Sequence, residues 1–258
     1  METTADNLLI AVPCFGGNLH YRTANTLLQL DRALGEKGIN RTVRFIGNDA
    51  LIPRCRNRFA NIAAFDLDAA GRKFSHVLFQ DADIAFDAFH IFTMLEANKP
   101  IVCLPYAAKS INWRNVAEAA KRGIPPEALP QFAGIPVFNT DRSFATNQIV
   151  AVPHSGTGAM LIQTAVLRTM AEKMPERRYK MCAGEIEASD TKRTEAFDFF
   201  KVGIYPGTLN YLPEDYYFEE DAKRLGFETF LIPWAQTLHV GSHEFTMNVQ
   251  AVAMAGKT

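Results

Sequence analysis

Two carboxylates separated by one residue follow an apolar segment in the first half of the chain. The segment His76–Phe79 (HVLF) has the composition of a buried strand, and Gln80 leads from it to Asp81-Ala82-Asp83. Side chains at the carboxyl end of a strand in an open α/β sheet face the crevice where such sheets bind ligands. A hard divalent cation there can bridge carboxylates to a diphosphate. Aspartate pairs also form turns and helix caps, so this spacing by itself leaves a structural role open.

A histidine near the end of the chain is the second candidate for metal binding. His239 lies in the strand-like segment Thr237–Val240 and is followed by Val240-Gly241. Imidazole suits Mn²⁺ better than Mg²⁺ as a partner for carboxylates. Asp81, Asp83 and His239 are therefore candidate ligands of Mn²⁺ or Mg²⁺, although a histidine in such a segment can equally be a packed core group.

A short basic run and an acidic pair offer groups for a nucleotide and for proton transfer. In PRCRNRFAN, Arg54 and Arg58 share one helix face, so Arg56 with Asn57 can face the phosphates or base of a nucleotide. A solvated helix start is the alternative. Glu214-Asp215 begins another predicted helix, where carboxylates favour the positive helix end. Alternatively, one of these carboxylates is a general base that deprotonates an acceptor hydroxyl.

Two further segments are candidates for substrate binding. Gly156-Thr157-Gly158 is a turn of small residues, which lets backbone approach either a ligand or a packed group closely. Tyr106, Lys109 and Trp113 open an irregular stretch, where aromatic rings and a cation suit a sugar or a base. Aromatic residues at such places also anchor loops.

Strands and helices must alternate to position these residues. Apolar runs and helical spacing predict strands and helices in turn through the first half of the chain, which is typical of a parallel sheet with helices on its faces. The predicted strands are Leu8–Pro13, Thr42–Ile46, His76–Phe79 and Pro100–Leu104, and the predicted helices are Arg22–Leu34, Ile52–Ala70 and Phe89–Ala97.

The second half of the chain is less regular. The stretch from 106 to 150 carries prolines and little periodicity beyond a short helix at Asn115–Arg122, which is typical of a binding segment. Elsewhere the pattern predicts strands at Gly158–Ile162 and Thr229–Ile232, helices at Thr164–Lys173 and Glu214–Leu225, and a mobile loop at Glu176–Thr194.

Composition limits the class of protein. The 258 residues are 48% hydrophobic with a formal net charge of −1, which argues against electrostatic coating of nucleic acid. No apolar stretch approaches the roughly 20 residues that cross a bilayer, and the first residues lack the features of a signal peptide. The four cysteines form no C-x-x-C pair. We therefore expect a soluble, cytoplasmic protein without stable membrane insertion.

The order of these motifs resembles that of the GT-A-fold glycosyltransferases, enzymes that use nucleotide sugars. The resemblance covers nearly the whole chain, from Leu8 to Phe245, and is greatest to a group found in bacteriophage and bacterial genomes. It extends more distantly to fungal mannan-type mannosyltransferases. The motifs that carry it are PRCRNRFAN, HVLFQDADIAF, PYAAKSINW, SGTGAMLI, YLPEDYYF and LHVGSHEF.

The resemblance implies a fold, a reaction and residue roles. It implies one GT-A-like (Rossmann-like) catalytic domain over 1–258, with a nucleotide-binding half at about 8–105, an acceptor-binding half at about 106–245 and a tail at 246–258. Pro13 and Cys14 would lie beside the base, and Arg56-Asn57 would face the nucleotide. Asp81 and Asp83 would hold Mn²⁺ or Mg²⁺ and the ribose-diphosphate.

The remaining implied roles concern the metal, the proton and the diphosphate. His239 would complete the metal shell, and Asp215 of the pair Glu214-Asp215 would act as base in an inverting reaction. Retaining relatives usually carry a Lys shortly after this histidine, but Val240-Gly241-Ser242-His243 has none. Contact with the diphosphate then falls to His243, Lys109 or an arginine.

These roles imply transfer of a sugar, by default from a UDP-sugar, to a hydroxyl of a glycan or of a hydroxylated DNA base. Two alternatives remain. Haloacid-dehalogenase-type phosphohydrolases also use D-x-D after an apolar strand, but normally on the first strand, whereas here the motif ends the third. The other alternative is a catalytically silent nucleotide- or carbohydrate-binding module, against which the acids and His239 argue.

Overall fold

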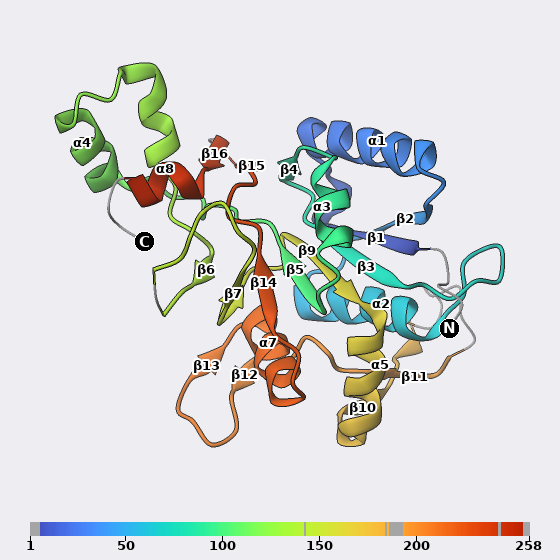
Figure 1. Cartoon of the computed structure of the whole chain (residues 1–258). Helices are drawn as coiled ribbons and strands as arrows, with labels where there is room; N and C mark the ends of the chain where they lie inside the picture. Colours follow the sequence, from blue (N-terminus) through green and yellow to red (C-terminus); the bar gives the residue numbers. More distant parts are fainter. Residues whose placement is uncertain (1–5, 142, 184, 186–192, 242–243, 255–258) are drawn as a thin grey trace.

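A seven-stranded sheet forms the centre of the molecule (Figure 1). The computed structural model describes residues 6–141, 143–183, 185, 193–241 and 244–254. The strand order is β2-β1-β3-β9-β5-β14-β7, in which β2, β1 and β3 run parallel, as do β5 and β14. The strands are β1 (Asn7–Cys14), β2 (Asn40–Gly47), β3 (His76–Gln80), β5 (Ile101–Cys103), β7 (Val150–Val152), β9 (Ala159–Gln163) and β14 (Thr229–Leu231). The predicted α/β class with a mostly parallel, Rossmann-like sheet is confirmed.

Helices cover both faces of this sheet because alternate strand residues point to opposite sides. In β1, Leu8, Ile10 and Val12 pack with α1 (Tyr21–Glu36) and α3 (His90–Glu96). Leu9 and Ala11 belong to the other core, which contains side chains of α2 (Ile52–Phe65), α5 (Thr164–Lys173) and α7 (Glu214–Arg224). Figure 1 shows α1 and α3 on one side of the sheet and α2 and α5 on the other.

The sequence predicted a strand at β9, but it did not predict the direction of that strand in the sheet. It runs antiparallel to both β3 and β5 and separates them. Its apolar sequence AMLIQ is buried between two neighbours, and such a run does not encode direction. Edge strand β7 also runs antiparallel, to β14.

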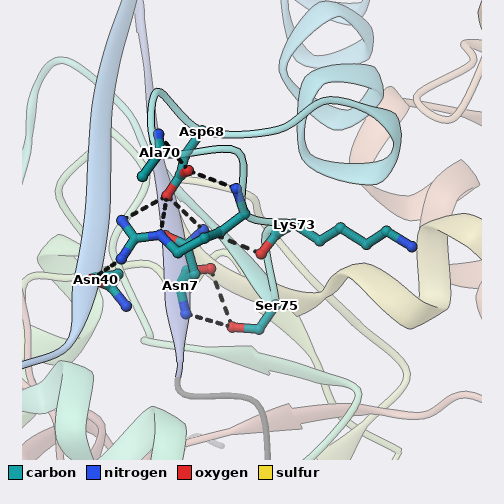
Figure 2. Close-up of polar contacts among 7 residues, drawn as sticks. Asn7, Asn40, Asp68, Ala70, Lys73 and Ser75 are labelled. Atoms are coloured by element: carbon teal, nitrogen blue, oxygen red, sulfur yellow. Dashed lines mark hydrogen bonds and ion pairs between the residues drawn. The ribbon is translucent and has the colours of Figure 1, made fainter.

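Helix α2 ends at Phe65, so the predicted range Ile52–Ala70 was too long. The chain turns because the carboxylate of Asp68 accepts hydrogen bonds from the backbone N–H groups of Ala70 (2.9 Å) and Arg72 (2.8 Å). The amide of Asn7 donates to the same carboxylate at 3.1 Å and ties this loop to the start of β1 (Figure 2). An aspartate that satisfies nearby backbone donors in this way competes with helix formation.

Part of the predicted irregular stretch packs with helix α8 (Val249–Met254) into a small separate cluster. Its helices α4 (Trp113–Lys121) and η2 (Pro126–Phe132) pack with α8 around Ala119, Phe132 and Ala251. Figure 1 shows α4 and α8 beside each other, away from the sheet. The segment predicted as a tail therefore contains a helix that takes part in packing.

Short strands complete the fold. A three-stranded sheet is built from β4 (Ile84–Phe86), β15 (Thr237–Val240) and β16 (Glu244–Met247), with β15 in the middle. The two-stranded pairs are β6 (Phe138–Asn139) with β8 (His154–Ser155), β10 (Arg178–Lys180) with β11 (Glu195–Phe197), and β12 (Gly203–Ile204) with β13 (Tyr211–Leu212). Much of the predicted mobile loop, residues 184 and 186–192, lies outside the described residues. Over the described part of the chain, no helix combines the length and apolar character needed to cross a membrane.

Leu30 and Leu28 of α1 offer a matched test of this core. Leu30 is fully buried, whereas Leu28 is 71% exposed. Leu30→Ala is expected to lower the free energy of unfolding by about 2–5 kcal/mol, because it leaves a cavity under the sheet. Leu28→Ala is expected to change it by less than about 0.5 kcal/mol. Urea unfolding of both variants measures the difference, and equal losses would contradict this placement of α1.

Candidate active site

A cavity of about 550 Å³ opens at the carboxyl ends of β1, β2 and β3. Ligands bind at this edge of open α/β sheets. We call it the strand-end cavity. Five side chains singled out in the sequence line it: Pro13, Cys14, Arg56, Asp81 and Asp83.

The backbone of the D-x-D turn is held by three separate chain segments. The N–H of Asp81 donates to the carbonyl of Gly158 at 3.0 Å. The carbonyl of Ala82 accepts from the N–H of His20 at 2.9 Å, and that of Asp83 from the N–H of Val240 at 2.8 Å. The residue before β9, the N-cap of α1 and strand β15 thus fix the direction in which both carboxylates leave the backbone.

Arg56 connects the first acid of this turn to helix α7. Its guanidinium donates from Nη2 to Asp81 Oδ2 and from Nε to Glu214 Oε1, both at 3.2 Å. The residue is only 4% exposed. Burial lowers the pKa of Arg56, but the charges of Asp81 and Glu214 outweigh it and raise the pKa above its usual range. Its Nη1 is buried and has no hydrogen-bond partner among the described residues. Other atoms of Arg56 line the strand-end cavity, so the residue places a positive charge beside it.

The second acid has a different pair of neighbours. Asp83 forms an ion pair with the ammonium of Lys109, and its Oδ1 lies 3.5 Å from Nε2 of His239. Burial would raise the pKa of Asp83, but contacts with His239 and Lys109 outweigh that effect and lower it. Asp83 is therefore held as a carboxylate in a setting that favours positive charge.

The orientation of His239 suits metal binding. Its Nδ1 lies 2.7 Å from the carbonyl oxygen of Ala107, so Nδ1 carries a proton and donates it. In the neutral ring this leaves the lone pair of Nε2 on the side of Asp83. Metal-binding histidines are commonly fixed by such a bond from the other ring nitrogen. Asp83 and His239 thus fit a divalent cation.

Asp81 is turned toward Arg56 instead. Across the residues that the structure describes, no three His, Cys, Asp or Glu side chains converge as a metal site. The predicted three-ligand set of Asp81, Asp83 and His239 is therefore not assembled in this structure. Mg²⁺ commonly takes one or two carboxylates plus substrate phosphates, so a two-residue set is chemically sufficient.

The small-residue turn approaches Tyr106. A Cβ atom on Gly156 would lie 1.9 Å from the Tyr106 hydroxyl oxygen, and one on Gly158 would lie 2.9 Å from the ring. Tyr106 is buried and its ring meets that of His239 edge to face, with centroids 5.5 Å apart. Thr157 is buried as well. The two glycines thus let the ring of Tyr106 pack closely enough to contact His239. The substrate contacts predicted for Tyr106 and for Gly156-Thr157-Gly158 stay predictions.

Asp215 directly follows Glu214, the residue that Arg56 binds. It lies in the first turn of α7, where its Oδ1 accepts from the N–H of Tyr216 at 2.9 Å. Burial, followed by the charge of Glu214, raises the pKa of Asp215 to about 6. A carboxylate with this pKa is ionised at neutral pH and is a stronger base than an ordinary aspartate.

Two predicted binding residues lie elsewhere. The amide of Asn57 is engaged by the chain itself, donating to Asp198 Oδ1 and accepting from the N–H of Phe200, both at 2.7 Å. Asn57 is not among the residues that line the strand-end cavity. Trp113 is 69% exposed at the start of α4. His243 lies outside the described residues.

The strand-end cavity also contains residues that the motifs did not indicate. Asp49 follows β2 and accepts from Arg54 at 2.8 Å, with Arg58 at 3.7 Å. Phe15, Asn18 and His20 follow β1. Their position directly after a predicted strand could have identified them as cavity residues. Ligands bind at the carboxyl ends of the strands in open α/β sheets. The same argument, made for the predicted strand Thr42–Ile46, would have included Asp49.

Comparisons with known proteins give distant similarities only. No family model and no curated protein matches the sequence. The structure of A197 from STIV is similar with a TM-score of 0.44 and 13% identity, over 91% of this chain and 86% of that one. A 4-diphosphocytidyl-2C-methyl-D-erythritol synthase from Anaerococcus prevotii has a TM-score of 0.34 and 10% identity, over 72% and 84%. At this distance the function has to be inferred from the side chains.

Arg56→Met tests the buried ion network. It leaves Asp81 and Glu214 without their shared counter-charge, so we expect the free energy of unfolding to fall by about 3–5 kcal/mol. Arg32→Met is the control, because Arg32 is 82% exposed in a surface pair with Glu36. Its effect should stay below about 0.5 kcal/mol. Chemical denaturation distinguishes the two, and a wild-type midpoint for Arg56→Met would refute the network.

The raised pKa of Asp215 predicts a pH effect on stability. The folded state binds this proton more tightly than the unfolded state, so its contribution is present at low pH and is lost as pH rises through about 6. Between pH 5 and pH 7.5 the wild type should lose about 1.4 kcal/mol relative to Asp215→Asn. Thermal unfolding of both proteins at the two pH values measures this, and a pH-independent difference would contradict it.

Proposed function

We propose that this protein is a metal-dependent glycosyltransferase of the GT-A type. It moves a sugar from a nucleotide-sugar donor, by default a UDP-sugar, to a hydroxyl group. The observation that carries the proposal is the bridge by Arg56 between Asp81 of D-x-D and Glu214 of the E-D pair. It joins the D-x-D turn, whose acids suit a metal and a diphosphate, to the start of α7, where Asp215 follows Glu214 and is suited to proton transfer.

The donor half of the site is the strand-end cavity. Pro13 and Cys14 line it at the end of β1, where a base would lie, while the guanidinium of Arg56 places a positive charge beside the cavity that favours an anion. Asp83 and His239 would hold Mn²⁺ or Mg²⁺, which when bound neutralises charge on a departing diphosphate. A preorganised cation and guanidinium stabilise this charge without reorganisation during the reaction.

The acceptor half contains Asp215. In the transfer, the acceptor oxygen forms a bond to the anomeric carbon, the bond from that carbon to the diphosphate breaks, and Asp215 accepts the hydroxyl proton. Its pKa of about 6 supports this role, because the group is both ionised and basic near neutral pH. Glu214 is held by Arg56 and positions the first turn of α7. The acceptor is a glycan or a hydroxylated DNA base, since both offer a hydroxyl.

Two isosteric variants separate the roles of the acids. Asp83→Asn is expected to abolish Mn²⁺-dependent binding of UDP, because it removes a metal-binding charge. Asp215→Asn should bind UDP normally and lose transfer and donor hydrolysis by about 10²–10⁴-fold. Calorimetric titration measures binding, and release of UDP from a panel of UDP-sugars measures turnover. Asp87→Asn is the control, since Asp87 is exposed and its cap on Phe89 can be kept by asparagine.

Normal nucleotide binding by Asp83→Asn would overturn the metal assignment. Normal turnover by Asp215→Asn would overturn the assignment of the base.

A further inference from the structure

Each acid of the D-x-D turn is paired with a basic side chain, and the two pairs differ in kind. Arg56 is buried and contacts two acids from different elements. Lys109 contacts Asp83, and both side chains are partly exposed, at 42% and 36%. Removing the guanidinium would leave the half-buried carboxylates of Asp81 and Glu214 without their counter-charge, whereas the ammonium of Lys109 can move into water.

The backbone places Lys109 beside His239. Ala107 accepts the hydrogen bond of His239 Nδ1, and the N–H of Ala108 donates to Ile135 at 2.8 Å. The segment before Lys109 is thus fixed to the element that carries the histidine. The ammonium of Lys109 and the imidazole of His239 therefore both contact the carboxylate of Asp83.

We propose that Lys109 is an exchangeable counter-cation: it holds Asp83 in the ligand-free protein, releases it to a divalent cation, and then becomes available to the nucleoside diphosphate. This inference rests on the proposed function. A lysine and a divalent cation on one carboxylate repel each other, so occupancy by one disfavours the other. The released ammonium is a flexible point charge and can meet a phosphate oxygen.

This exchange makes metal and nucleotide binding cooperative. The divalent cation frees Lys109 for the diphosphate, and a diphosphate that engages Lys109 leaves Asp83 open for the cation. Each ligand then raises the affinity of the other by the same factor. The chain also keeps a cation on Asp83 before any ligand arrives.

Lys109→Met tests the exchange through binding of Mn²⁺ alone, which is measured from the electron paramagnetic resonance signal of the free ion. The variant should bind Mn²⁺ about three- to tenfold more tightly than the wild type, because no ion pair has to be broken and no positive charge repels the metal. In saturating Mn²⁺ it should bind UDP at least about threefold more weakly, because one charge contact is lost. Lys121→Met, which removes an exposed lysine of α4 paired with Glu118, should match the wild type.

The possible outcomes separate this inference from the proposed function. Tighter Mn²⁺ binding with weaker UDP binding supports the exchange. Unchanged Mn²⁺ affinity in Lys109→Met, with loss of Mn²⁺ binding in Asp83→Asn, overturns the exchange and leaves the proposed metal site standing. Tighter Mn²⁺ binding with unchanged UDP affinity overturns the contact of Lys109 with the diphosphate. Absence of Mn²⁺ binding to the wild type, with and without UDP, overturns both proposals.

Discussion

The buried guanidinium of Arg56 is the constraint on which the site depends. It lies in α2, Asp81 follows β3, and Glu214 begins α7, so one side chain fixes three elements relative to one another. Burial removes the guanidinium from water, which is unfavourable. The two carboxylates offset this desolvation only while all three groups stay together. A folded chain therefore cannot separate the D-x-D turn from the start of α7 without exposing or stranding a charge. The acids of the proposed donor and acceptor halves are held in one place before any ligand binds.

Around this fixed point, the site divides into a rigid part and an exchangeable part. Backbone hydrogen bonds from three segments hold the D-x-D turn, and Tyr106, packed against Gly156 and Gly158, braces the ring of His239. Lys109 is the contrasting element, because its ion pair is partly exposed and its side chain is flexible. Rigid acids with a movable counter-charge can stay neutralised in the free protein and still accept a cation and a diphosphate.

Much of the fold could be predicted from the sequence, because apolar periodicity determines strands and helices locally. The antiparallel direction of β9 could not, since a fully buried strand looks the same in either direction. In the site, the position of Asp81 and Asp83 at a strand end predicted that they face the ligand crevice, and the resemblance placed Pro13 and Cys14 beside the nucleotide. All four residues line the same cavity. The sequence could not show that Asn57 is engaged by Asp198 and Phe200, which are more than a hundred residues away in sequence. Long-range polar partners of this kind decide a side chain's role and leave no local pattern.

The central claim is that the strand-end cavity binds a nucleoside diphosphate together with a divalent cation. Thermal unfolding of the wild type with UDP, GDP, CMP, ADP or dTDP, each in Mn²⁺ and in EDTA, tests it most directly. A ligand present at about a hundred times its dissociation constant stabilises the folded state by about 2.7 kcal/mol, which is readily seen as a higher melting temperature. We predict that one of the nucleoside diphosphates raises the melting temperature in Mn²⁺ and not in EDTA, whereas CMP, which has a single phosphate, does not. Equal melting temperatures for all nucleotides in Mn²⁺ would contradict the claim.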